Sequence, residues 1–317
     1  MFDVITIGSG VLDIYLRASG FKKIATTDIP GGTALCLPFG GKLETADLEV
    51  TTGGGATNTA VSFTRLGFNT AIVCELGQDL IGATIKEELR REQVNLDFVI
   101  EEVGEETGLS TILVTDDGGR AIAVYRGASK MLTVSDIPWE KLTAPWLYVT
   151  SLGGDVELLG SLIDHARSHQ VKIAINPGKA EIDRLSPSKA KNLFAGIDVL
   201  LLNRQEAQAL SGIPFDRDDV WKSEHCLIGP KTCVITDGKS GGKVCAQGKC
   251  AWFEAKAVTV VEETGAGDAF GSALVAALMK GKDIATAIDW GKTQSASVIS
   301  FIGPKKGLLK LEQIENK

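Results

Sequence analysis

The sequence lacks both a cysteine pair spaced as in metal or redox motifs and a long apolar run. Its six cysteines never occur as Cys-x-x-Cys, which argues against a zinc site and favours thiols kept reduced in the cytoplasm. No apolar stretch reaches the roughly 20 residues that a membrane-spanning helix needs. The first residues enter a strand pattern directly, without the basic and apolar regions of a signal peptide. We therefore expect a cytoplasmic protein that does not associate with membranes.

An excess of basic residues is also missing. The chain carries 33 Lys and Arg against 40 Asp and Glu, for a formal charge of −7, and this balance excludes a non-specific nucleic-acid binder. Apolar residues make up 44% of the 317 positions, which is ample for a buried core. This length fits one large α/β domain or two smaller ones.

Two common nucleotide-binding motifs are absent. The P-loop pattern GxxxxGK[ST] does not occur. The segment Gly8-Ser9-Gly10 follows an apolar strand, but Asp13 stands where a dinucleotide fingerprint needs its third glycine. This difference argues against a nicotinamide-dependent dehydrogenase. The Asp13 carboxylate can accept hydrogen bonds from a vicinal diol at the end of the strand, or it can serve as a turn residue.

Strand-like and helix-like runs alternate along most of the chain, which predicts a mainly parallel sheet covered by helices. The expected strands are Val4–Gly8, Thr70–Leu76, Leu147–Thr150, Lys172–Asn176, Val199–Asn203 and Thr232–Thr236. The expected helices are Ala56–Leu66, Ala83–Gln93, Leu158–Gln170, Ser188–Ala195, Gln205–Gly212, Gly265–Lys280 and Ile284–Ile299. Ligands of such sheets bind beyond the carboxyl ends of the strands.

Two segments interrupt this alternation. Residues 15–52 are rich in Gly, Thr and Pro without a helical period. Residues 107–125 read as a hairpin whose turn is Asp116-Asp117-Gly118-Gly119. Together they predict a small β layer that closes over the ligand edge of the sheet. Two surface excursions without a catalytic role are the alternative.

The most informative stretch is Thr264-Gly265-Ala266-Gly267-Asp268, which precedes an apolar helix. A glycine turn at a helix N-terminus exposes backbone N–H groups and a partial positive charge, so it suits a phosphate. The Asp268 carboxylate is then placed to take a proton from a hydroxyl that attacks phosphorus. The structural alternative is an Asp that only favours the helix dipole.

Three further motifs follow strands or precede helices. The run Gly53-Gly54-Gly55 leads to Asn58, whose amide can both donate to and accept from sugar hydroxyls. Asn203 and Glu206 have the spacing of a helix capping box, and the alternative is that both face nucleotide phosphates and order Mg²⁺ through water. The run Thr236–Gly242 is expected to form a loop on the nucleotide side.

The order of these motifs resembles the ribokinase, or PfkB, family of carbohydrate kinases over essentially the whole chain. The resemblance rests on Gly8–Asp13, Gly53–Asn58, Gly77–Gly82, Asn203-x-x-Glu206, Thr236–Gly241 and, most specifically, Thr264–Asp268. It implies a three-layer α/β/α fold with a mainly parallel central sheet and a small β-sheet lid. The core would comprise residues 1–14, 53–106 and 127–317, and the lid residues 15–52 and 107–126.

The resemblance also implies a role for each motif residue. Asp268 would be the general base, and the backbone of Gly265, Ala266 and Gly267 would complete an anion hole. The substrate would contact Asp13, Gly53, Gly54, Asn58 and Arg126. ATP would contact Asn203, Glu206, Thr236, Asp237, Gly238, Gly241 and Gln294, and Glu206 would hold Mg²⁺ through water. The expected reaction is ATP-dependent phosphorylation of a hydroxymethyl group on a sugar or nucleoside, in a homodimer joined through the lid.

Several alternatives stay open. Glu262-Glu263 stand where the family usually has Asp-Thr, and in ribokinase-like members that Asp helps to bind a monovalent cation, so the dependence on K⁺ is undecided. Arg126 lies in a stretch that resembles the carboxylate-binding segment of sugar-acid kinases such as ketodeoxygluconate kinase, and it can equally pair with an acid of the lid. A non-catalytic sugar or nucleotide sensor on the same fold is the alternative outside enzymes.

Overall fold

The computed structural model describes residues 1–28, 32–115, 119–214, 217–221 and 229–316. Its centre is a nine-stranded sheet in the order β15-β14-β13-β12-β11-β10-β1-β6-β7. Every neighbouring pair is parallel except β13–β14 and β14–β15, which confirms the predicted mainly parallel sheet. The strands are β1 (Val4–Ile7), β6 (Thr70–Gly77), β7 (Asn95–Glu102), β10 (Trp146–Val149), β11 (Lys172–Ile175), β12 (Val199–Asn203), β13 (Thr232–Thr236), β14 (Gly242–Ala246) and β15 (Lys249–Phe253).

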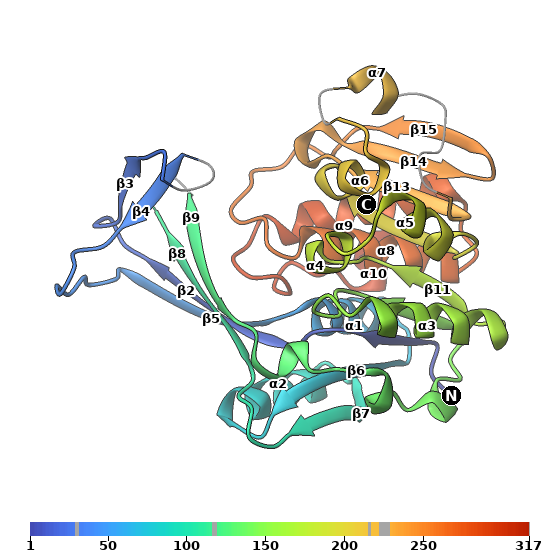
Figure 1. Ribbon diagram of the computed structural model, residues 1–317, viewed down its shortest axis with the longest axis horizontal. Coiled ribbons are helices and arrows are strands. Elements are labelled where there is room, and N and C mark those ends of the chain that lie inside the picture. The colour runs from blue at the N-terminus through green and yellow to red at the C-terminus, as the bar shows by residue number, and fades with distance from the viewer. Residues whose placement is uncertain (29–31, 116–118, 215–216, 222–228, 317) are drawn as a thin grey trace.

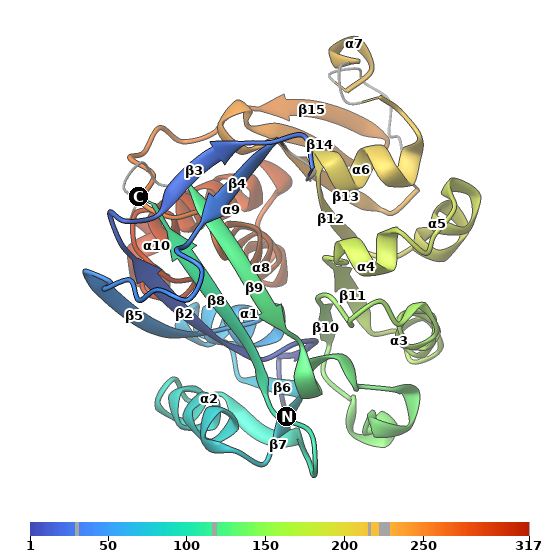
Figure 2. The ribbon, with the colours of Figure 1, turned by 60° about the vertical axis from the view of Figure 1, so that its left-hand side comes forward.

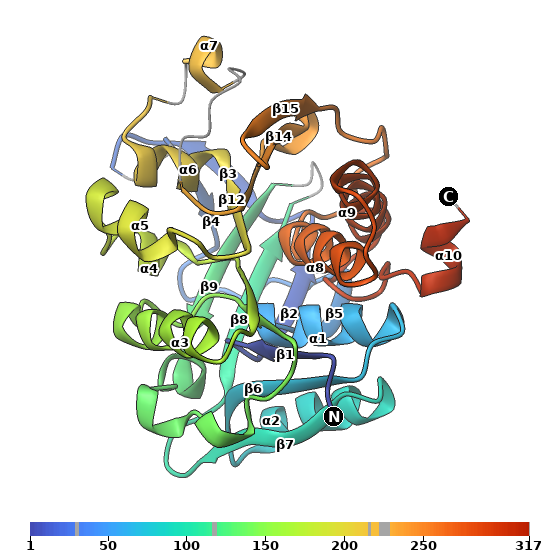
Figure 3. The same ribbon diagram turned by 90° about the vertical axis from the view of Figure 1, so that its right-hand side faces the viewer.

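Helices cover both faces of this sheet (Figure 3). One face packs against α3 (Val156–Ser168), α5 (Pro187–Phe194) and α6 (Arg204–Ser211). The other packs against α1 (Gly55–Arg65), α2 (Leu80–Arg91), α8 (Ala266–Met279) and α9 (Ile284–Val298). The short helices are α4 (Lys179–Ile182), α7 (Asp218–Trp221), α10 (Leu311–Glu315), η1 (Gly127–Lys130), η2 (Val134–Asp136), η3 (Trp139–Lys141) and η4 (Gly238–Ser240).

The two cores follow from the alternation of side chains along each strand. In β1, Ile5 and Ile7 enter the core on the α3 side, whereas Val4 enters the core formed with α8 and α9. Parallel strands covered on both faces are apolar throughout, and all four β1 residues are buried. Because these strands run parallel, their carboxyl ends share one edge of the sheet, where the predicted residues Asn203 and Thr236 lie side by side.

A second, four-stranded sheet in the order β5-β2-β8-β9 projects from the core (Figures 1 and 2). It consists of β2 (Val11–Arg17), β5 (Asp47–Gly53), β8 (Gly108–Val114) and β9 (Arg120–Tyr125), and the hairpin of β3 (Lys22–Ala25) and β4 (Thr33–Cys36) extends its far end. The predicted hairpin is the antiparallel pair β8–β9, although its turn at Asp116–Gly118 lies outside the described residues. The sheet begins at Val11, earlier than the predicted lid boundary at residue 15.

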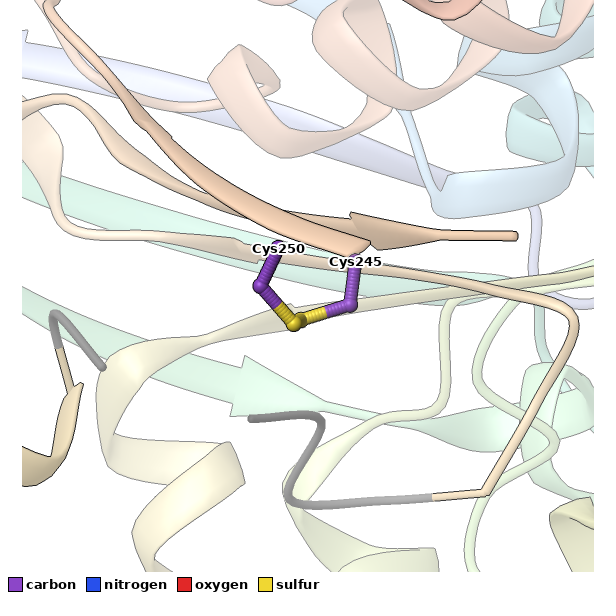
Figure 4. Close-up of a disulfide and its surroundings, with 2 residues drawn as sticks. All are labelled: Cys245 and Cys250. Carbon is purple, nitrogen blue, oxygen red and sulfur yellow. A yellow bond between two sulfur atoms is a disulfide. The ribbon is translucent and has the colours of Figure 1, made fainter. Parts of the chain in front are cut away.

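The cysteines differ from the prediction of reduced thiols. Cys245 and Cys250 face each other in register on β14 and β15, and they form a disulfide (Figure 4). The connecting turn contains Gln247 and Gly248, both with positive φ of 51° and 77°. This two-residue turn sets the register that places the two sulfurs together. The prediction of fully reduced cysteines is therefore wrong at these two positions.

Candidate active site

The glycine turn before α8 has the conformation that an anion hole needs. Gly265 is the N-cap residue with φ 79°, and a Cβ at this position would lie 2.4 Å from Cβ of Pro304. Only glycine fits both the left-handed backbone and this close contact. A Cβ on Gly267 would meet nothing within 4 Å, so the N-terminal turn of α8 is open to a ligand. The Asp268 side chain lies in this first turn.

The Asp268 carboxylate is held by the first helix of the chain. Nδ2 of Asn58, on α1, donates a hydrogen bond of 2.8 Å to Oδ2 of Asp268. Burial raises the pKa of Asp268 to about 6, against the lowering effects of Asn58 and of the Lys305 charge. A carboxylate with this pKa is ionised at neutral pH and still basic enough to accept a proton.

Asn58 itself presents an unused acceptor. The side chain is 4% exposed, and its Oδ1 has no hydrogen-bond partner among the described residues. A buried polar atom without a partner costs about 1–3 kcal/mol, and a ligand hydroxyl at this position would remove that cost. The α1 N-terminus closely approaches the connection between β1 and β2, because a Cβ on Gly54 would lie 2.5 Å from the Ser9 carbonyl oxygen.

Asp13 lies nearby on β2 and is 6% exposed. Burial raises its pKa, and a hydrogen bond from Ser110 and the charge of Lys305 oppose this effect. Gly53 lies directly against Asp13, since a Cβ there would meet Oδ2 at 2.1 Å. The structure therefore brings Asp13, Gly53, Gly54, Asn58 and Asp268 to the junction between the small sheet and the core.

A contact that sequence reasoning missed joins the small sheet to the glycine turn. Arg120, at the start of β9, donates to Oε1 of Glu262 at 2.5 Å. The same oxygen accepts from the backbone N–H of Thr264 at 2.8 Å and from its hydroxyl at 2.6 Å. Glu262 is 8% exposed, and the hydroxyl of buried Tyr15 lies beside it. Glu262 thus connects strand β9 to Thr264, the residue before the glycine turn that we predict to form the anion hole.

The residues predicted to contact the nucleotide follow β12 and β13, which end in register at Asn203 and Thr236. The Asn203 side chain accepts from the Glu206 N–H at 2.8 Å, and Oε2 of Glu206 accepts from the Asn203 N–H at 2.8 Å. This reciprocal pair is the capping box that the spacing predicted. Burial raises the pKa of Glu206 to about 7, with a smaller contribution from Glu181.

The loop after β13 is fixed by a charge pair. Oδ2 of Asp237 accepts from Arg204 at 2.7 Å, and Arg204 is also paired with Asp218. Gly238 begins η4 and has open space at its Cβ position, whereas the same position on Gly241 is filled by the Phe253 carbonyl. The loop thus presents Gly238 to the exterior and uses Gly241 for the turn into β14.

Two predicted residues lie apart from this geometry. Gln294 is 0% exposed, donates to Ser62 at 3.3 Å and accepts from the Leu309 N–H at 3.1 Å. Its side chain therefore belongs to the packing between α1 and α9, and we leave it out of the proposed nucleotide site. Arg126 is exposed at the base of β9, and its side chain has no ion-pair partner within the described ranges. The predicted pairing of Arg126 with an acid of the lid is thus not seen.

The described part of the chain contains no cluster of three or more His, Cys, Asp or Glu residues that would hold a metal ion. In the same residues, no helix combines the length and apolar character that crossing a bilayer would require. Because the carboxylates of the site stand singly, a divalent cation there would depend on phosphate oxygens and water for most of its ligands.

Sequence comparisons with known proteins found the following similarities. The model of the pfkB family carbohydrate kinases matches residues 26–310. The chain is 27% identical over 321 residues to the ribokinase of Staphylococcus aureus strain COL, with 98% of each chain covered.

Solved structures share the fold. Arabidopsis thaliana ribokinase complexed with ribose and ATP superposes with a TM-score of 0.78 at 21% identity, covering 99% of this chain and 98% of that one. Burkholderia thailandensis nucleoside kinase in complex with inosine gives 0.77 at 17% identity, covering 99% and 96%. The architecture is thus the ribokinase-like fold expected from the motifs. The chain belongs to the pfkB family of carbohydrate kinases and is a phosphotransferase of the sugar-kinase type.

Proposed function

We propose that this protein transfers the γ-phosphoryl group of ATP to a hydroxymethyl group of a sugar or nucleoside. The observation that carries the proposal is the pair formed by Asn58 and Asp268 beside the open turn at Gly267. A half-buried carboxylate in a helix N-terminal turn is unfavourable for binding phosphate alone, because like charges repel. The carboxylate is suited to a reaction in which it gains a proton as phosphate arrives.

In the proposed mechanism, Asp13 and Oδ1 of Asn58 hold hydroxyl groups of the substrate. Asp268 accepts the proton of the attacking hydroxyl, whose oxygen then bonds to the γ-phosphorus in line with the departing ADP oxygen. The N–H groups of the turn at Gly265–Gly267 receive the negative charge that develops on the transferred group. The small sheet acts as the lid that keeps water from the phosphorus.

The residues fit a magnesium–ATP complex only in part. Oε2 of Glu206 already accepts from the Asn203 backbone, so we infer that Glu206 contacts Mg²⁺ through a water molecule rather than directly. When bound, the cation neutralises charge on the β- and γ-phosphates. Asn203, Thr236, Asp237 and Gly238 lie along the same edge, and we propose that they line the phosphate and ribose side of the nucleotide.

The substrate class is left to experiment, with one residue favouring an additional candidate. Arg126 is exposed and has no ion-pair partner in the described part of the chain. An exposed guanidinium close to the base of the lid suits the carboxylate of a sugar acid. A panel of ribose-like sugars, fructose-like sugars, nucleosides and sugar acids therefore tests the full range.

We also propose a homodimer formed through the small sheet. The side chains of Leu48 and Val50 on β5 are 64% and 52% exposed and lie on the same face of the strand. Exposed apolar residues on an edge strand favour association with a second sheet. Sedimentation or light scattering of the protein, compared with a Val50→Lys variant, tests the dimer. A monomeric wild-type protein would contradict it.

Transfer of ³²P from ATP to each member of the panel tests the proposed reaction. We expect one substrate class to be phosphorylated, and Asp268→Asn to reduce kcat by about 10²–10⁴-fold, the range of a general base. Asp164→Asn is a matched control, because Asp164 is 76% exposed on α3. Binding of sugar or ATP without any transfer would instead indicate a sensor. Near-normal turnover of Asp268→Asn would remove Asp268 from its role.

A further inference from the structure

A buried lysine lies directly behind the proposed reaction centre. Lys305, in the loop after α9, is 5% exposed. Its Nζ donates to the Thr52 carbonyl at 3.0 Å, to the Thr52 hydroxyl at 2.5 Å and to Oε2 of Glu88 at 3.4 Å. Lysine is rarely buried to this extent unless it is paired, and its one contacting carboxylate is at a long distance. The cost of burying the charge calls for compensation from other groups.

The loop of Lys305 is packed against the glycine turn of the active site. Pro304, its neighbour in the chain, fills the space next to Gly265 and leaves no room for a Cβ there. The Lys305 carbonyl accepts from Arg65 of α1 at 3.0 Å. Arg65 is held in turn by Glu92 at 2.6 Å. The backbone of this loop is thus fixed on both sides, so the ammonium has a defined position relative to Asp268.

The other end of the contact is the strand that leads into the substrate site. Thr52 is the second-to-last residue of β5, and the last residue, Gly53, lies against Oδ2 of Asp13. The ammonium of Lys305 therefore joins the α9 loop, α2 and the base of the small sheet at one point. Two carboxylates of the site, Asp13 and Asp268, lie within reach of its charge, which lowers the pKa of each.

We propose that Lys305 is a positioning residue for phosphoryl transfer, whose buried ammonium keeps the Asp268 carboxylate ionised and fixes the end of β5 beside Asp13. This inference rests on the proposed function, in which Asp268 is the base. The ammonium does not touch the reacting atoms. It acts through its charge on Asp268 and through the position of Thr52.

Other groups near Asp268 do not supply this charge. Asn58 is neutral and contributes its hydrogen bond. The Tyr148 hydroxyl, on β10, has a pKa well above 10 because of burial and the Asp268 charge, so it stays neutral. Asp13 is acidic, and Glu262 acts on Asp13 by raising its pKa. Glu88 faces Lys305 from α2 at 3.4 Å, where its negative charge favours the ammonium form of Lys305 and partly offsets the field of that ammonium at other groups. Within the described part of the chain, Lys305 is the cationic residue whose charge lowers the pKa of Asp268.

The test is the pH dependence of kcat/KM for four variants compared with the wild-type protein. Lys305→Gln keeps a hydrogen-bond donor and removes the charge, whereas Lys305→Arg keeps the charge and changes the shape. Lys306→Gln is the matched control, because Lys306 is 60% exposed and makes a 3.7 Å ion pair with Glu49. Glu88→Gln removes the carboxylate whose negative charge partly offsets the ammonium charge felt by Asp268. Circular dichroism and unfolding of each variant give its stability separately from the kinetics.

We expect the acid limb of the pH profile of Lys305→Gln to move to higher pH by roughly half a unit to one unit. This shift lies at or below the low end of the roughly 1–3 units that an adjacent opposite charge produces, because Lys305 does not contact Asp268. A shift of one unit from a pKa of about 6 reduces kcat/KM at pH 6 about fivefold, and activity recovers at high pH. Lys305→Arg and Lys306→Gln should keep the wild-type limb. Glu88→Gln should move it to lower pH, a direction that general destabilisation does not produce.

The inference would be overturned if the acid limb of Lys305→Gln stays at the wild-type pH, or if kcat/KM of this variant falls by the same factor at every pH. If Lys305→Gln does not fold, Glu88→Gln decides, and a limb that stays in place or moves upward refutes the proposal. Failure of the proposed function is distinguishable from these outcomes, because the wild-type protein would then show no phosphoryl transfer or Asp268→Asn would retain it.

Discussion

The Asp268→Asn variant should lose activity and gain stability, and both effects follow from one pKa. The folded protein raises the pKa of Asp268 from 3.8 to about 6 because the carboxylate is buried. The ionised form is therefore disfavoured by folding. The contribution of Asp268 to the free energy of unfolding is fully present below pH 3.8, where the carboxyl is protonated in both states, and it is lost as the pH rises through about 6. The wild-type protein at pH 7 and above carries this penalty, and the neutral amide does not.

The size of the gain follows from the shift. About two pKa units at 1.36 kcal/mol each correspond to about 3 kcal/mol, and partial exposure of the side chain makes this an upper bound. For a chain of this size, 1 kcal/mol corresponds to roughly 2 °C in Tm, so a rise of several degrees is expected above pH 7. In Asp268→Asn the new amide still offers a side-chain oxygen that can accept the hydrogen bond from Nδ2 of Asn58, so the pair with α1 is retained.

Urea unfolding of both proteins at pH 4.5, 6, 7 and 8.5, without ligands, measures this difference. The gain should be largest at pH 7 and 8.5 and should shrink below pH 6, where the wild-type carboxylate becomes protonated. The same residue should give wild-type kcat/KM an acid limb near pH 6. A variant that is less stable at every pH, or equally more stable at pH 4.5 and 8.5, would refute the reasoning.

Three further predictions concern the lid side of the site. Asp13→Ala should raise KM for the sugar at least tenfold with a smaller effect on kcat, because we propose that Asp13 holds substrate hydroxyls and takes no part in proton transfer. Unchanged steady-state constants would exclude Asp13 from the site. Arg120→Ala should lower kcat/KM several-fold and Arg120→Lys should restore part of it, since Arg120 donates to Glu262 at 2.5 Å and Glu262 accepts from Thr264 at 2.8 Å. An Arg120→Ala variant with wild-type stability and wild-type kcat/KM would contradict this link. Replacing K⁺ by tetramethylammonium should change kcat/KM less than twofold, because the Arg120 guanidinium already neutralises Glu262; a tenfold loss would show that a monovalent cation is required.

Much of the central sheet is readable from local sequence. The strands β12 and β13 begin and end at the predicted residues, because each is a short apolar run bounded by polar residues. The start of α6 is visible in the capping box of Asn203 and Glu206. The strand β7 (Asn95–Glu102) was not predicted, since its Asp97, Glu101 and Glu102 interrupt the apolar pattern of an edge strand.

The candidate site is readable only in part, for a physical reason. Asp268, Asn58 and Asp13 stand in glycine motifs whose local meaning is visible in the chain. Lys305 stands in Gly-Pro-Lys-Lys-Gly, which reads as an exposed basic turn, and its burial arises from contacts with β5 and α2. Arg120 and Glu262 are 142 positions apart, and no local pattern relates them.

The disulfide is a similar case. The spacing between Cys245 and Cys250 becomes meaningful only once Gln247 and Gly248 are recognised as a two-residue turn. Gln-Gly is a weaker hairpin signal than Asn-Gly or Asp-Gly. The two strands also lie at the edge of the sheet, where Lys249 interrupts the apolar run.

The contact between Asn58 and Asp268 has a consequence for biosynthesis. It joins residues 210 positions apart, and the contact between Thr52 and Lys305 joins residues 253 positions apart. Contacts of such sequence separation form late in folding, because the intervening chain must first become ordered. On the ribosome, β1, α1 and β6 can therefore assemble long before Asp268, the proposed base, meets Asn58. With the proposed roles of Asp268 and Lys305, the nascent chain gains phosphotransferase activity only after α8 and the loop carrying Lys305 have both emerged.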